Sequence, residues 1–159
     1  MGRYHIDLSK VPAGHTCPPL LASFADWLAT QSHASVGYFD ALLAEEITHH
    51  WDEDNAARLQ KAAWSFLHLP DGSLVALLDT GVSGSPPAVV LLESEGEART
   101  IATSLEGFLH KLADADTGVS DLDDGEASTG RPALKDWLRE KTVTTPSAPD
   151  FDFGAWLGR

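Results

Sequence analysis

The chain has 159 residues, of which 43% are hydrophobic and 22% charged, a composition typical of one globular domain. Its 24 acidic and 11 basic residues give a formal charge of -13 at pH 7, and no segment gathers lysine and arginine, which argues against nucleic acid as a partner. Cys17 is the single cysteine, so an internal disulfide is ruled out, and no apolar run has the length of a signal peptide or a membrane span. We therefore expect a soluble, cytoplasmic protein.

Hydrophobic patterns predict the elements of the first third of the chain. Residues 3–8 alternate between apolar and polar, as in a short strand, and residues 20–28 carry an apolar stripe at helical spacing. The apolar side chains from Leu42 to Ile47 indicate one or two further helical turns. Residues 56–63 are rich in alanine, which favours another helix.

The middle of the chain is predicted to form consecutive strands followed by a helix. Turn residues separate four apolar runs, which are residues 64–69, 73–78, 88–92 and 99–103. Thr103 is then expected to cap a helix, with Glu106 reaching back to the cap amide, and Phe108 is expected in the core. This order predicts an α+β fold: a central antiparallel sheet, built as a meander of about four or more strands, with helices packed around it.

The composition changes after Ala113. Residues 114–130 combine acids with glycine, serine and threonine, which predicts an acidic loop, and Pro132 suits the first turn of a last helix. We expect residues 1–140 to form a single domain and residues 141–159 an extended tail. The large apolar side chains of that tail are Phe151, Phe153, Trp156 and Leu157. Exposed apolar side chains of this size are expected to pack against another surface. We favour their own domain as this surface, and the alternative is a second copy of the chain or a partner protein.

The segment around His49 is the best candidate for a metal site. Glu46 and His49 would share one helical face, but the second copy that a di-iron motif needs is absent, and His50 would point elsewhere. Residues 81–85 lack the closing glycine of a nucleophile elbow, and no phosphate-binding or dinucleotide loop motif occurs. The sequence therefore predicts no catalytic, cofactor-binding or metal-binding residue, and a protein that is not an enzyme.

Several segments together resemble the SUKH superfamily of Smi/Knr-like proteins. The similar segments are residues 20–28 with Trp27, Val36–Phe39, Leu69–Ser73, Pro87–Leu92 with the turn at 95–97, and Ile101–Leu109. The resemblance implies an α+β fold and a non-enzymatic role. Bacterial members are widely immunity proteins that bind and neutralise a cognate toxin in the cytosol, and fungal relatives are signalling and cell-wall regulators. The family supplies no catalytic residues to transfer.

The resemblance makes an immunity protein the first hypothesis for function. A regulatory or scaffold protein without a toxin partner is the alternative, and a small metal-dependent enzyme at the His49 segment is less favoured. Acidic side chains would cover the basic active site of a toxin, often a nuclease. The acidic residues expected to contact this partner are Glu45, Glu46, Asp52, Glu53, Asp54, Asp121, Asp123 and Asp124. Neither nucleic acid nor a membrane is an expected partner, and the oligomeric state stays open.

Overall fold

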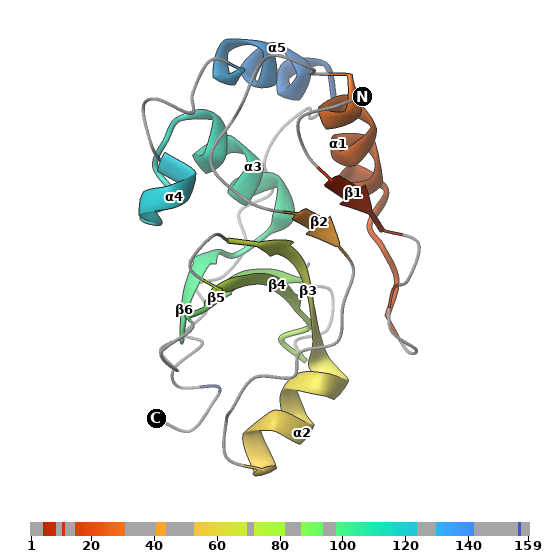
Figure 1. Cartoon of the computed structure of the whole chain (residues 1–159), viewed down its shortest axis with the longest axis vertical. Coiled ribbons are helices and arrows are strands. Elements are labelled where there is room, and N and C mark those ends of the chain that lie inside the picture. Colours follow the sequence, from red (N-terminus) through yellow and green to blue (C-terminus); the bar gives the residue numbers. More distant parts are fainter. Residues whose placement is uncertain are drawn as a thin grey trace.

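The computed structural model describes residues 5–8, 11, 15–30, 41–43, 53–69, 72–81, 87–93, 98–123, 130–141 and 156. Its centre is a six-stranded sheet in which the strands follow one another in chain order (Figure 1). The strands are β1 His5–Asp7, β2 Ala41–Leu43, β3 Ala63–His68, β4 Leu74–Leu78, β5 Ala88–Leu92 and β6 Ala98–Ala102. The helices are α1 Pro19–Ala29, α2 Glu53–Ala62, α3 Leu105–Ala113, α4 Ser120–Asp123 and α5 Arg131–Lys141.

The predicted α+β fold is confirmed, and β3 to β6 form the expected antiparallel meander. β5 has the predicted bounds, and the bounds of the other three strands differ from the prediction by one residue. In the centre of the meander Leu74 pairs with Leu92 and Leu78 with Ala88. Short runs of apolar, largely β-branched or leucine residues between turn signals were therefore enough to locate these strands.

The central strands are buried on both faces of the sheet. All five residues of β4 and all five of β5 are buried. α1, α3 and α5 lie over one face, and α2 lies on the opposite side (Figure 1). The larger core cluster contains Phe24, Phe66 and Phe108, and the smaller cluster, under α2, contains Leu59 and Leu78. An antiparallel sheet with one wet face would alternate, so the continuous apolar runs reflect cover on both sides.

β2 corrects one prediction. Residues 41–43 form a strand and not the expected helical turn, while Ile47 lies outside the described residues. β2 pairs in parallel with β1, which falls inside the strand predicted at residues 3–8, and Ala41 pairs with His68 of β3. A three-residue apolar run cannot distinguish helix from strand by periodicity. Residues 41–43 form a strand because they pair with β1, which lies more than thirty residues earlier in the chain.

α3 follows the predicted strand but has a different cap. Ser104 is the N-cap residue, because its backbone is extended and its Oγ accepts a hydrogen bond from the Gly107 N–H at 3.0 Å. The assignment of the cap to Thr103 was therefore wrong. β6 ends at Ala102, and the chain turns through two residues before the first helical residue, Leu105. The core position of Phe108 is confirmed, since that side chain is fully buried.

The other predicted helices are confirmed with small changes in their bounds. α1 contains the predicted stripe, α2 begins three residues before the predicted start, and α5 has Pro132 in its first turn. α1 and α5 meet through half-buried indoles, with the ring centroids of Trp27 and Trp137 5.9 Å apart. None of the helices among the described residues is long and apolar enough to cross a bilayer.

Candidate functional site

A cavity of about 310 Å³ lies where β3 begins and β4 ends. Its lining residues are His15, Thr16, Ala62, Trp64, Leu77, Asp79 and Pro87. They come from the segment before α1, the junction of α2 and β3, the end of β4 and the residue before β5. This volume is at the lower end of the range of small-ligand pockets, and the lining joins apolar walls to a few polar groups, as binding sites do.

Local hydrogen bonds fix Asp79 at the rim of this cavity. Its backbone N–H donates to the Ala62 carbonyl oxygen at 2.8 Å, which ties the end of β4 to the end of α2. Its Oδ1 accepts a hydrogen bond from the Gly81 N–H at 2.9 Å, the bond of an Asx turn. Gly81 has a φ of 80°, which glycine adopts without strain. The Asp79 side chain is exposed, and no ion pair to its carboxylate occurs among the described residues.

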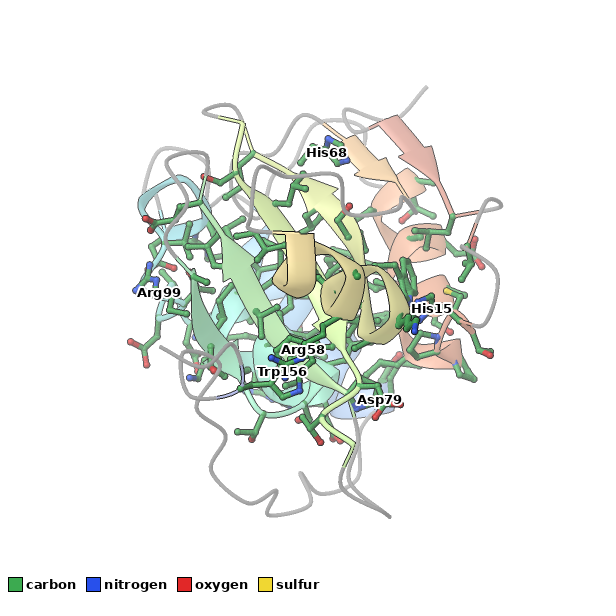
Figure 2. The ribbon with its side chains drawn as sticks, turned by 90° about the horizontal axis from the view of Figure 1, so that it is seen from below. His15, Arg58, His68, Asp79, Arg99 and Trp156 are labelled. Carbon is green, nitrogen blue, oxygen red and sulfur yellow. The ribbon has the colours of Figure 1, made fainter. Side chains whose placement is uncertain are left out.

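The remaining walls differ in polarity. Trp64 and Leu77 are each only 3% exposed, so they form the deep apolar part of the cavity. His15 is half-buried, while Thr16 and Pro87 are exposed at the opening. His15 and Asp79 lie on the same side of the Arg58–Trp156 pair (Figure 2). An imidazole, a hydroxyl and a carboxylate therefore surround an apolar floor.

Arg58 and Trp156 form a contact between α2 and the C-terminal tail. The guanidinium carbon of Arg58 lies 4.1 Å from the centroid of the Trp156 ring, and its Nη2 donates to the Trp156 carbonyl oxygen at 2.5 Å. Trp156 packs against the smaller core cluster. Trp156 therefore packs on its own domain, as the favoured prediction for the tail requires. The other apolar residues of the tail, Phe151, Phe153 and Leu157, lie outside the described residues.

A second cavity, of about 250 Å³, lies between α3 and α5 and has a different charge balance. It is lined by His110, Ala113, Asp114, Lys135 and Arg139. Here the Lys135 Nζ is 3.1 Å from the Asp114 Oδ1, so the acid of this cavity already has a cation beside it. Both partners are about half exposed, and such pairs contribute little to stability.

The predicted partner-binding acids that the structure describes lie on two different helices. Glu45, Glu46, Asp52 and Asp124 lie outside the described residues, as does the metal candidate around His49. Glu53 and Asp54 belong to the first turn of α2, whereas Asp121 belongs to α4. α2 and α4 lie on opposite sides of the sheet (Figure 1). Among the described residues, no group of three or more His, Cys, Asp or Glu side chains could hold a metal ion.

Asp123 has a role inside the segment predicted as an acidic loop. Its Oδ1 accepts hydrogen bonds from the Thr117 N–H at 3.0 Å and the Thr117 hydroxyl at 2.6 Å, and its Oδ2 accepts one from the Gly118 N–H at 2.9 Å. The buried Val119 and Leu122 anchor the same segment. Residues 114–123 therefore form turns and the short helix α4, where composition alone predicted a loop.

Comparison of the chain with protein-family models, with curated proteins and with solved structures finds no match. The cavity beside Asp79 is thus identified by geometry. Sequence reasoning did not select His15, Thr16 or Asp79 for binding, because four segments separated along the chain build this cavity and no local motif marks them.

Proposed function

We propose that this chain is a non-catalytic protein-binding module of the immunity type, which binds a toxin in the cytoplasm and blocks it. The observation that carries the proposal is a formal charge of -13 on a domain whose central strands are enclosed on both faces. Helices and loops are then the surfaces left for a partner. Their acidic excess suits a basic protein and repels nucleic acid.

The resemblance to the SUKH superfamily supports the same proposal. It implies an α+β domain with a central antiparallel sheet and surrounding helices, and β2 to β6 of this chain form such a sheet. It also implies a function in binding rather than catalysis. The single cysteine, Cys17, suits a reducing compartment such as the cytoplasm.

The proposed mechanism is steric and electrostatic. A toxin that cleaves nucleic acid needs a basic surface for phosphate groups, and an acidic protein competes for that surface without performing any reaction. Long-range attraction speeds the encounter, and close contacts determine how long the complex lasts. Inhibition should then be stoichiometric.

The test begins with the gene next to the one that encodes this chain. Its product, if it kills cells when expressed alone, is purified and mixed with this chain in increasing ratios. The proposal requires rescue of growth on co-expression, a one-to-one complex, and toxin activity that falls to background at equimolar ratio. Full toxin activity at a molar excess of the folded chain would contradict the proposal and favour a scaffold without a toxin partner.

A further inference from the structure

We propose that the cavity beside Asp79 binds the guanidinium group of an arginine side chain that the partner presents. The inference deepens the proposed function, on which it rests for the identity of the partner.

The Asp79 carboxylate gives the cavity a negative charge. The Asp79 carboxylate uses Oδ1 to accept the Gly81 N–H, and it has no ion-pair partner among the described residues. A carboxylate can accept up to about four hydrogen bonds, so acceptor capacity is left for an incoming donor. The second cavity is different, because Lys135 already lies 3.1 Å from the carboxylate of Asp114. Of these two sites, the cavity beside Asp79 is the one prepared for a cation.

The other walls favour guanidinium over ammonium. Guanidinium is planar and weakly hydrated, and it stacks on aromatic rings, whereas an ammonium is a strongly hydrated point charge. Trp64, Leu77 and Pro87 provide apolar walls for such a plane and for the methylene groups behind it. A guanidinium carries five N–H donors, of which a carboxylate takes two in a bidentate pair. The Thr16 hydroxyl lines the same space and can accept a hydrogen bond from a third donor.

A single buried arginine would matter more for affinity than the acids on the rest of the surface. Exposed charge pairs change mainly the association rate, whereas a charged anchor in a desolvated pocket changes the dissociation rate. The deep walls of this cavity are apolar, with Trp64 and Leu77 only 3% exposed, and a bound guanidinium would cover the exposed Asp79 carboxylate. The Asp79 cavity is therefore an anchor point, distinct from the general acidity of the chain.

The test uses a pair of probes of the same shape, 1-butylguanidinium and its neutral analogue 1-butylurea, added to the full chain. NMR follows the backbone amide of Asp79 and the indole N–H of Trp64 during each titration. We expect saturable, millimolar binding of butylguanidinium that shifts both signals, and roughly ten-fold weaker binding of butylurea. Equal binding of the two probes, or the absence of any saturable shift at Asp79 and Trp64, would overturn the inference.

Two variants locate the charge that matters. Asp79→Asn keeps the oxygen that accepts the Gly81 N–H, so the turn persists, and it should weaken butylguanidinium binding roughly ten-fold without changing butylurea. Asp114→Asn, in the cavity where the acid is already paired, is the matched control and should leave both probes unaffected. An equal loss in the two variants would contradict the assignment to Asp79.

The same variants separate this inference from the proposed function. If a toxin is neutralised by the wild-type chain and by Asp79→Asn with the same dissociation rate, the arginine anchor is wrong while the immunity function stands. If butylguanidinium binds as described but the chain leaves the toxin fully active, the site is correct and the function is wrong.

Discussion

The rings of Phe66 and Phe108 meet edge to face, with their centroids 5.9 Å apart and their planes at 85°. This contact joins β3, the first strand of the meander, to α3, the helix that follows its last strand. Both side chains are fully buried in the larger core cluster. Aromatic pairs in this geometry stabilise a fold by about 0.5–1.5 kcal/mol beyond the burial of their area.

Phe108→Ala should therefore lower the free energy of unfolding by about 3–5 kcal/mol, because it removes a large ring from a packed site. Phe108→Leu keeps most of the apolar volume and should cost clearly less. Urea denaturation of the three proteins, followed by circular dichroism, measures the difference. An unchanged midpoint for the alanine variant would mean that α3 is not docked on β3 through this ring.

Asp123→Ala should destabilise the connection between α3 and α4. Three hydrogen bonds from Thr117 and Gly118 would lose their acceptor, and hydrogen bonds to charged groups contribute about 1.5–3 kcal/mol each before relaxation and replacement by water. We expect a net loss of about 1.5–3 kcal/mol. Asp116→Ala, a nearby exposed acid, is the control and should change stability by less than about 0.5 kcal/mol. Equal effects of the two variants would argue against the internal role of Asp123.

Arg58 and Trp156 should be coupled energetically. A double-mutant cycle of Arg58→Ala and Trp156→Ala, read by urea denaturation of the monomer, should give a coupling of about 0.5–1 kcal/mol, the range for exposed cation–π pairs. Trp156→Ala alone should also lower stability, because its ring packs on the smaller core cluster. Strict additivity of the two substitutions, with stability unchanged by Trp156→Ala, would contradict folding back on the same domain.

Association with the proposed toxin partner should slow as salt rises. Acidic steering is screened over about 10 Å at 0.1 M ionic strength, so the association rate should fall while the dissociation rate changes little. Stopped-flow mixing across a salt series measures both. Glu53→Gln with Asp54→Asn, in the first turn of α2, should reduce the salt dependence if this end of the molecule faces the partner. An association rate that does not depend on salt concentration would contradict electrostatic steering and favour an apolar interface.

Cys17 should react slowly with alkylating agents in the folded protein. Burial raises the pKa of the Cys17 thiol above its usual value, and a backbone hydrogen bond from Ala22 lowers the pKa by a smaller amount. Less thiolate is then present near pH 8, so iodoacetamide should modify the native chain more slowly than the urea-unfolded chain. Equal rates in the two states would contradict this.

The same pKa predicts how stability changes with pH. The folded state holds the thiol proton more tightly than the unfolded state, so this contribution is complete below the usual pKa of cysteine and is lost as pH rises through the raised value. Cys17→Ser removes this part of the pH dependence. Because the chain has one cysteine, no other thiol contributes to the difference in pH dependence between the wild-type chain and this variant.

The sequence predicted those parts of the fold that depend on neighbours along the chain. β5 is a continuous apolar run between turns, and α5 begins at a proline-containing first turn, so local chemistry defines both. β2 was predicted wrongly because its partner, β1, is distant in sequence. The cavity could not be predicted from local sequence patterns, because its lining residues are also distant from one another in sequence. Asp79 lines a cavity only because folding brings Trp64 and His15 to the end of β4.

β6 is an edge strand of the sheet, and it pairs with β5 on its inner side. It therefore covers the backbone hydrogen-bonding groups of β5 that would otherwise be exposed. β5 is uncharged and entirely apolar, and an exposed strand of this kind would recruit the strands of other molecules. Arg99 is exposed on β6, and its Nη2 donates to the carbonyl oxygen of Gly118, where the α3–α4 connection passes. A charged side chain on an edge strand disfavours pairing with the strands of other molecules, and Arg99 places one of the 11 basic residues of the chain at this edge.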